Sequence, residues 1–481
     1  MSRQRTPERL LHDAVVVIPG IMGSALRDVE NDTPLWGVGR LFQYSARAHA
    51  RRLRDLAVTD SERAGRTGRV EATGVLNFAD WLPGLGAAQP YNTLVSRLKR
   101  AALHRTAVIA FPYDWRLSVE HNGALLAHEA RRHLEAWRNH GAHRRHLSDH
   151  PEAGPAQLVF VAHSMGGLLA REVLHRGDLR GDVRTVMTVG TPFGGSVKAS
   201  VMLNSGKGAP LLLPPEVLRE VTPGMPGLYD LLPGYRACAE GADMRVPEVD
   251  DIVALGGRRD LAQATVDWRS SRRDTLLPDH VMVVGMGQRT WQSYRLDAGA
   301  AFAQRYMFRR HGGRVVVDAA GRPRQEDRKG DGTVYQFAAH LPGSDARPVH
   351  VFQEHSALAR SESVIDLACG LLRGLRHSDE LGDMLGAGEF GLNTPEWADP
   401  DVPFDIEVEG VEPGADLQCT VREVSGLDVV HHLALKETPD TPGTWTTTCP
   451  AGRAGLYEVE VLGGAEPMRR LVPVLAAEQH G

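Results

Sequence analysis

The spacing of apolar residues changes character along the chain. In the first two-thirds, short apolar runs rich in β-branched residues predict buried strands, and stretches with an apolar residue every three or four positions predict amphipathic helices. The clearest predicted strands are 14–20, 106–115, 157–163, 183–192, 280–287 and 348–353, and the clearest predicted helices are 91–103, 166–176 and 356–375. This alternation is typical of an α/β domain built on a mostly parallel sheet.

Two segments interrupt the alternation. The first, about 27–88, is rich in arginine and turn residues, and the second, about 197–275, contains "LLLPPEVL" and "GMPGLYDLLPGY". Insertions of this size on an α/β scaffold commonly act as lids or caps over a site, and we expect that role here. The apolar stretches 209–218 and 225–232 leave three interpretations open: an acyl pocket, contact with a membrane surface, and ordinary packing within a cap.

Beyond residue 400 the pattern becomes a strict alternation of apolar and polar residues. In "PFDIEVEGV", Phe404, Ile406 and Val408 are separated by acidic residues, and several similar short runs follow with turn residues between them. Such spacing predicts a small all-β sandwich of immunoglobulin-like type. We therefore expect an α/β domain at 1–385, a linker at 386–400 and the sandwich at 401–481.

Length and charge agree with this division. A chain of 481 residues is long for one domain, and its net charge of -5 gives no reason to expect a nucleic-acid partner. The apolar runs are too short to span a bilayer, and the basic start is followed only by a short run predicted as a strand. We expect a cytoplasmic protein, and a peripheral position at the inner membrane surface is compatible with that expectation.

Cysteine and histidine usage points away from disulfides and metals. The four cysteines, Cys238, Cys369, Cys419 and Cys449, are too scattered for a disulfide framework or a zinc site. Whether Cys419 and Cys449 pair within the sandwich stays open, with free thiols favoured in the cytoplasm. The histidines at 140, 143, 146 and 150 lack acids or cysteines at ligand spacing. No metal is expected.

Ser164 is the first candidate for chemistry. It lies in "VFVAHSMGGLLAREVL" between a predicted strand and a predicted helix, with Ala162 two residues before it and Gly166 two residues after it. A nucleophile elbow needs this strand, sharp turn and helix, and small flanking residues let the chain turn tightly. The alternative is a serine that only caps the helix.

A serine hydroxyl needs a histidine to take its proton and a carboxylate to orient that histidine. In an α/β-hydrolase the chain order is serine, acid, histidine, and "KGDGTVYQ" and "VHVFQEHSALARSE" supply Asp331 and His355 in that order. Asp331 could instead serve only to form a turn or belong to a weak cation-binding loop, and His355 could be only a helix-start residue. The rivals are Asp327 and Asp345 for the acid, and His340 and His350 for the base.

The tetrahedral intermediate of acyl transfer needs two backbone N–H donors. One normally belongs to the residue after the nucleophile, here Met165, and the other to a loop after an early strand. In "VVVIPGIMGSAL" the first predicted strand ends at Pro19 and Gly20, which places the amide of Ile21 at the expected position.

Five motifs in fixed order carry a family resemblance. They are "IPGIMGSAL" (18–26), "FPYDWR" (111–116), "AHSMGG" (162–167), "GTPFGGS" (190–196) and "GDGTV" (330–334), followed by a histidine at 355. Over roughly 12–376 the chain resembles the lecithin:cholesterol acyltransferase family. It differs from the secreted members in having no cysteine at 27–88, and no signal peptide is expected from its basic first residues. The family also does not normally carry a C-terminal sandwich.

The resemblance implies an α/β-hydrolase fold and acyl transfer from a phospholipid, through an acyl-serine, to water or a lipid alcohol. It implies that Ser164 is the nucleophile, Asp331 the acid and His355 the base, with an oxyanion hole from the amides of Ile21 and Met165. No cofactor is expected, and the substrate is expected to be a lipid or a membrane surface. Because "FPYDWR" follows a predicted strand, Asp114 and Arg116 are predicted to form a structural ion pair, with a direct role in binding substrate as the alternative.

Two other functions stay open at this stage. The first is a soluble carboxylesterase or triacylglycerol lipase, which would use the same residues on a different ester. The second is a non-catalytic binding scaffold, in which the C-terminal sandwich recruits a protein partner.

Overall fold

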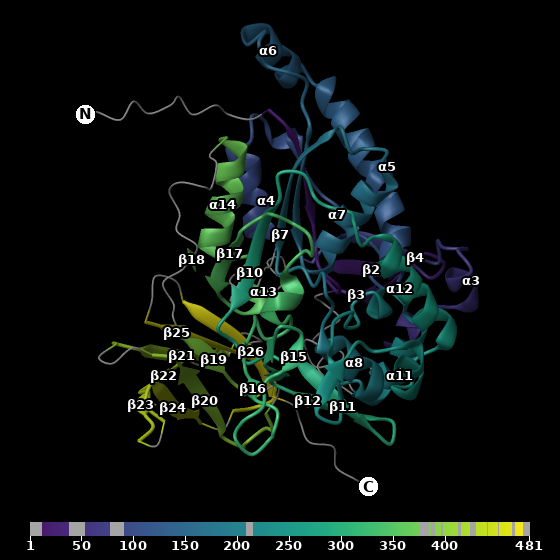
Figure 1. Ribbon diagram of the computed structural model, residues 1–481. Helices are drawn as coiled ribbons and strands as arrows, with labels where there is room; N and C mark the ends of the chain where they lie inside the picture. Colours follow the sequence, from purple (N-terminus) through teal and green to yellow (C-terminus); the bar gives the residue numbers. More distant parts are fainter. Residues whose placement is uncertain are drawn as a thin grey trace.

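In the computed structural model the chain forms an α/β domain followed by an all-β domain (Figure 1). The structure describes residues 12–37, 53–76, 91–207, 215–374, 384–385, 390–395, 398–411, 415–423, 430–439, 441–450, 452–463 and 467–474. The apolar stretch predicted at 209–218 therefore lies partly outside the described residues. None of the described helices is both long and apolar enough to cross a bilayer.

A seven-stranded sheet in the order β18-β17-β10-β7-β6-β1-β5 forms the centre of the first domain, and all of its strand pairs are parallel. The strands are β1 Ala14–Ile18, β5 Val108–Ala110, β6 Leu158–His163, β7 Val183–Val189, β10 Val281–Met286, β17 Pro348–Phe352 and β18 Met384–Leu385. This sheet and its flanking helices confirm the predicted α/β-hydrolase fold.

Helices cover both faces of the sheet, so the strands read as continuous apolar runs rather than alternating ones. Alternate residues of β1 belong to two separate apolar clusters: Val15 and Val17 to one, Val16 and Ile18 to the other. The first cluster includes helices α4 Asn92–Ala101 and α14 Glu362–Leu372, and the second includes α5 Val119–Arg138 and α7 Met165–Arg176. Figure 1 shows these two helix pairs on opposite sides of the sheet.

Two predicted elements need correction. The strand predicted at 106–115 is regular only over Val108–Ala110, because Pro112 has no N–H to continue the ladder beyond Phe111. The helix predicted at 356–375 is two helices, α13 His355–Leu358 and α14, because Ser361 takes an extended conformation between them.

The two predicted insertions are folded segments anchored to the sheet domain. The first contains β2 Ser24–Asp28, β3 Thr33–Trp36 and β4 Val70–Val75, paired as an antiparallel sheet, with η1 Arg54–Leu56 and α3 Asp60–Arg63. The second contains α8 Val197–Ser205, α9 Pro215–Val221, η4 Thr222–Gly224, α10 Pro226–Tyr229, β8 Cys238–Glu240, β9 Asp243–Arg245, α11 Val249–Ala254 and α12 Arg259–Ser271.

A third insertion, between β10 and β17, was not predicted from the sequence. It contains β11 Ser293–Asp297, β12 Ala300–Gln304, β13 Met307–Phe308, β14 Arg310–His311, β15 Arg314–Val315, β16 Gln325–Glu326 and η5 Gln336–Ala339. Strand β11 pairs with β8 in the sheet β12-β11-β8-β9. The second and third insertions therefore form one structure.

The C-terminal domain has two four-stranded antiparallel sheets around one apolar cluster. Their orders are β19-β20-β24-β23 and β22-β21-β25-β26, from β19 Gly391–Asn393, β20 Phe404–Glu409, β21 Gln418–Glu423, β22 Val430–Leu433, β23 Lys436–Glu437, β24 Thr444–Cys449, β25 Gly455–Leu462 and β26 Met468–Val474. The all-β sandwich is confirmed. Its first strand lies inside the predicted linker 386–400, because Leu392 pairs with Val408 of β20.

All four cysteines are free and buried. Burial raises the pKa of Cys419 to about 12 and that of Cys449 to about 11, so both stay protonated thiols at neutral pH.

The ion pair predicted between Asp114 and Arg116 is present and extends into the first insertion. The Arg116 guanidinium donates to Asp114 Oδ1 at 2.8 Å and Oδ2 at 2.6 Å, to Glu62 Oε1 at 2.9 Å, and to the Leu56 carbonyl at 3.1 Å. The Arg116 side chain is fully buried. This network ties the first insertion to the loop after β5.

We expect Arg116→Met to lower the free energy of unfolding by about 3 kcal/mol, because it leaves Asp114 buried without its cation and leaves buried Glu62 paired with Arg69 alone. Urea unfolding followed by circular dichroism measures this. The control is Arg132→Met, which removes an exposed pair with Glu129 on α5 and should change stability little. Equal effects of the two substitutions would contradict the prediction.

Candidate active site

Ser164 occupies a strained turn between β6 and α7. Its backbone has φ 52 and ψ -127, a conformation that costs a non-glycine residue energy. It lies at the position before the helix, yet its side chain makes no capping hydrogen bond there. The structure therefore does not use this serine as a helix cap.

Close backbone approaches hold the turn in place. A Cβ atom added at Gly166 would lie 2.6 Å from the Ile18 carbonyl oxygen, and one added at Gly20 would lie 2.8 Å from Ser164 Cβ. Real Cβ contacts are longer than this, so both positions require glycine. The loop after β1 consequently lies directly beside Ser164.

The structure brings Ser164, His355 and Asp331 together. His355 Nε2 is 2.9 Å from Ser164 Oγ, and His355 Nδ1 is 2.7 Å from Asp331 Oδ2. A carboxylate oxygen accepts hydrogen bonds, so Nδ1 carries the hydrogen and Nε2 faces the serine hydroxyl as an acceptor. This is the order of contacts that a serine nucleophile needs.

Asp331 is completely buried and anchored by backbone amides. Its Oδ1 accepts from Thr333 N at 2.9 Å and Val334 N at 2.6 Å, and its carbonyl accepts from His355 N at 2.8 Å. The rival acid Asp327 instead accepts from Gln292 Nε2 and Lys329 N, and Asp345 is exposed.

Two further glycines make room for the acid and the histidine. A Cβ atom at Gly190 would lie 3.2 Å from both Asp331 Oδ2 and His355 Nδ1, and one at Gly285 would lie 2.6 Å from Asp331 Cβ. Gly190 begins the motif "GTPFGGS", so this motif packs against the candidate site. Ser196 of the same motif donates to the Thr333 carbonyl at 2.5 Å.

The backbone amides of Ile21 and Met165 belong to residues next to the serine turn. Ile21 follows Gly20, which lies against Ser164, and Met165 is the first residue of α7. Within the described ranges neither amide donates a hydrogen bond to another group of the protein. Their role as an oxyanion hole stays a prediction.

A hydrogen-bond chain that the sequence analysis missed connects the loop after β1 with His355. Gly20 N donates to Tyr91 Oη at 2.9 Å, Tyr91 Oη lies 2.8 Å from His163 Nδ1, and His163 Nε2 lies 3.0 Å from the His355 carbonyl oxygen. Since a carbonyl only accepts, His163 donates from Nε2 and accepts from Tyr91 at Nδ1.

Burial and the neighbouring His355 lower the pKa of His163 to about 3, so its ring is neutral at physiological pH. In the sequence, His163 is recognisable as a polar residue at the end of the apolar run 157–163. Tyr91 has no such signal, because it lies far from the other motifs along the chain.

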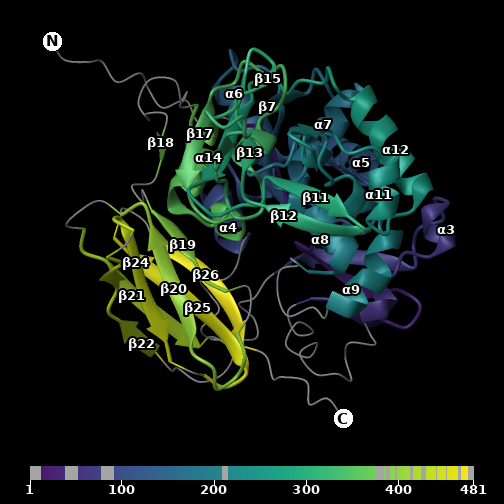
Figure 2. The ribbon, with the colours of Figure 1, turned by 60° about the horizontal axis from the view of Figure 1, so that its bottom comes forward.

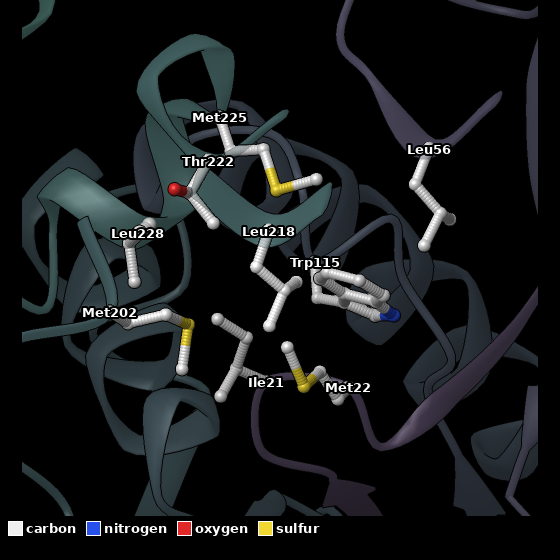
Figure 3. Close-up of a pocket in the computed structure, with 9 residues that line it drawn as sticks. All are labelled: Ile21, Met22, Leu56, Trp115, Met202, Leu218, Thr222, Met225 and Leu228. Carbon is white, nitrogen blue, oxygen red and sulfur yellow. The ribbon is translucent and has the colours of Figure 1, made fainter. Parts of the chain in front are cut away.

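A small apolar cavity lies beside the loop after β1 (Figure 3). Its lining residues are Ile21, Met22, Leu56, Trp115, Met202, Leu218, Thr222, Met225 and Leu228. Figure 3 shows side chains from that loop facing side chains from the second insertion across the cavity. Leu218, Met225 and Leu228 belong to the two apolar stretches singled out in the sequence.

In the part of the chain that the structure describes, no group of three or more His, Cys, Asp or Glu side chains is arranged to hold a metal ion. His146 instead lies in a row of mutually tilted rings with His12 and His150, at centroid distances of 4.8 and 4.7 Å.

Residues 67–253 match the family described as lecithin:cholesterol acyltransferase. The resemblance to the lecithin:cholesterol acyltransferase family is confirmed. The match includes Ser164 and the motifs at 111–116 and 190–196, and it ends before Asp331 and His355. Together with the α/β-hydrolase fold, this family match identifies an enzyme of the hydrolase and acyltransferase class. No curated protein matches the chain.

Several solved structures show a similarity to this chain at low sequence identity. The Tle4-Tli4 complex matches with 15% identity over 75% of this chain and 98% of the other, at a TM-score of 0.48. The mature lipase BlEst2 of Bacillus licheniformis matches with 13% identity over 77% of this chain and 96% of the other, at a TM-score of 0.31. The product of gene lin2722 of Listeria innocua matches with 12% identity over 76% of this chain and 96% of the other, at a TM-score of 0.26.

We expect His163 to make the stability of the protein sensitive to acid. Below pH 6.5 the unfolded chain binds a proton at this histidine that the native protein excludes, so the stability present above pH 6.5 is lost as the pH falls. Between pH 7 and pH 5 this loss amounts to about 2 kcal/mol. Urea unfolding of wild type and His163→Gln at both pH values measures it.

The control for this comparison is His128→Gln, whose side chain is exposed on α5. We expect the control to keep the acid sensitivity of the wild type and His163→Gln to lose part of it. The same change in stability between the two pH values in all three proteins would contradict a buried neutral His163.

Proposed function

We propose that this protein is a serine-dependent lipid acyl hydrolase or acyltransferase that takes a fatty acyl group from a phospholipid through an acyl-Ser164 intermediate. The observation that carries the proposal is the continuous contact from Ser164 Oγ through His355 to Asp331, beside an apolar cavity. The family match supports the substrate class.

In the first half-reaction Ser164 Oγ attacks the acyl carbonyl carbon while His355 Nε2 takes the hydroxyl proton. The carbonyl oxygen becomes an oxyanion, which the amides of Ile21 and Met165 stabilise. The ester bond then breaks, and His355 returns the proton to the departing lysophospholipid oxygen. Asp331 keeps the imidazole oriented and stabilises its charged form.

In the second half-reaction water or a lipid alcohol gives its proton to His355 and attacks the acyl-serine. A second tetrahedral intermediate forms in the same oxyanion hole. Its collapse releases a fatty acid or a new ester, and Ser164 Oγ regains the proton from His355. No cofactor takes part in these steps.

The apolar cavity supplies the site for the acyl chain. Ile21 contributes its amide to the proposed oxyanion hole and its side chain to the cavity lining. An acyl group whose carbonyl oxygen lies at that amide would therefore have its chain next to the cavity. Removing the chain from water there is favourable by about 0.8 kcal/mol for each buried CH₂.

We also propose that the C-terminal sandwich is immunoglobulin-like. Its strand orders, β19-β20-β24-β23 and β22-β21-β25-β26, correspond to A-B-E-D facing C, F and G with an added edge strand.

Fluorophosphonate labelling tests the nucleophile. We expect an adduct on the wild type and none on Ser164→Ala, because the probe reacts with an activated serine hydroxyl. Mass spectrometry of the intact protein measures it. The control is Ser271→Ala, in which a serine at the end of α12 is removed and labelling should be unchanged. An unlabelled wild type, or equal labelling of Ser164→Ala, would refute the proposal.

Filling the cavity tests the acyl site. We expect Met225→Trp to lower turnover of vesicles of long-chain phosphatidylcholine at least about tenfold while turnover of a soluble short-chain ester is little changed. Free fatty acid, lysophospholipid and new ester are followed with and without a long-chain alcohol, which separates hydrolysis from transfer. If the wild type cleaves only the soluble ester, the protein is a carboxylesterase instead.

A further inference from the structure

The C-terminal sandwich contacts the first domain at two loops. The acid loop carries Asp331, and the histidine loop joins β17 to His355, the first residue of α13. Figure 1 shows the sandwich against the side of the first domain where β17 and α13 lie, and Figure 2 shows it below β17. Each of the two loops receives its own contacts from the sandwich.

The acid loop is held through Gln288, the second residue after β10. Gln288 exchanges backbone hydrogen bonds with Gly330, at 2.8 Å from Gln288 N and 3.1 Å from Gly330 N. Its side-chain Oε1 accepts from Leu392 N of β19 at 3.1 Å. One residue therefore joins the first strand of the sandwich to the neighbour of Asp331.

Charges reinforce this contact. Lys329, two residues before Asp331, pairs with Glu409 of β20 at 3.1 Å, and Arg289 donates to both Glu407 and Glu409. Burial opposes ionisation of Glu409, but hydrogen bonds from Arg289 and Lys329 outweigh it and hold its pKa below the usual value. Glu409 is thus an anion placed between two cations of the acid loop region.

The histidine loop has separate contacts. Gln353, two residues before His355, donates from Nε2 to the Pro467 carbonyl at 3.3 Å. Arg360 Nη1 lies 3.7 Å from Glu458 Oε2 of β25, and both side chains are largely buried. Contacts of this kind come from the second sheet of the sandwich, whereas β19 and β20 contact the acid loop.

The two domains also approach each other closely through backbone. A Cβ atom added at Gly391 of β19 would lie 2.4 Å from the carbonyl oxygen of Gly287. Gly287 directly follows β10 and precedes Gln288, which is hydrogen-bonded to Gly330 of the acid loop. The sandwich therefore contacts backbone next to that loop. Such a close approach leaves the two bodies little freedom to shift.

Asp331 and His355 come from different loops, and proton transfer needs their side chains aligned to a fraction of an ångström. Loops are the mobile parts of a fold, and an outside element that contacts both can fix their relative position. We propose that the C-terminal sandwich positions the acid–histidine pair, with Glu409 as the main positioning residue. This inference rests on the proposed function of Ser164, His355 and Asp331.

The test compares Glu409→Gln with Asp405→Asn in the full-length protein. Asp405, Glu407 and Glu409 alternate with buried residues on β20 and so project from the same face, but Asp405 is exposed and contacts Thr448 within the sandwich. Both substitutions neutralise one carboxylate on that face, and only Glu409→Gln breaks contacts with the first domain.

We expect Glu409→Gln to lower kcat for a soluble ester, and the rate of fluorophosphonate labelling of Ser164, about tenfold, with KM unchanged, because alignment for proton transfer is lost while binding is not. Asp405→Asn should match the wild type in both rates. Equal rates in Glu409→Gln and Asp405→Asn, or a loss that appears only in KM, would overturn the inference.

A double-mutant comparison guards against a merely structural effect. Lys329→Met should lower kcat through the same contact, so the double variant with Glu409→Gln should lose less than the product of the single losses. If the kcat loss of the double variant equals the product of the two single losses, the inference is overturned. If Glu409→Gln is insoluble, the comparison of kcat between Lys329→Met and Asp405→Asn decides alone. A wild type that shows no labelling at Ser164 refutes the proposed function instead.

Discussion

The crowding around Ser164 is the constraint on which the site depends. A serine with φ 52 and ψ -127 is strained, and the surrounding chain must prevent its relaxation. Gly20 and Gly166 allow backbone from the loop after β1 to contact both sides of the turn. Because β1 and β6 are parallel neighbours, their carboxyl ends meet at the same edge of the sheet. The sheet register thus determines where the hydroxyl points.

The same edge brings together groups that lie far apart in the chain. Asp331 belongs to the segment after β10 and His355 follows β17, and these two strands are parallel neighbours. The insertions start from this edge as well, so the cavity lining comes from the loops after β1 and β5 and from the first and second insertions. The buried network of Arg116 anchors the first insertion to this framework. Chemistry and substrate space therefore depend on one set of strand ends.

The sequence was informative where a role has a local pattern. Ser164, Asp331 and His355 each lie within a short motif beside a predicted strand, and their order along the chain matches the hydrolase order, so their placement together could be predicted. Tyr91 could not, because its contact with His163 spans 72 positions and no local pattern marks it. The third insertion and strand β19 were missed because their strands are only two to five residues long. Runs this short are too brief for a period of apolar and polar residues to reveal them.

Two histidines, His163 and His355, lie side by side at this site, and the proposed mechanism needs a positive charge on His355 alone. The rings of His163 and His355 are 5.0 Å apart. Acyl transfer as proposed requires His355 to become positively charged for a moment, and a second cation at this distance would oppose that charge. Burial keeps His163 neutral, and its fixed donor to the His355 carbonyl lets it hold the loop without adding charge. Two different groups therefore act on His355. The neutral ring of His163 holds its backbone carbonyl, and the buried Asp331 contacts its ring at Nδ1.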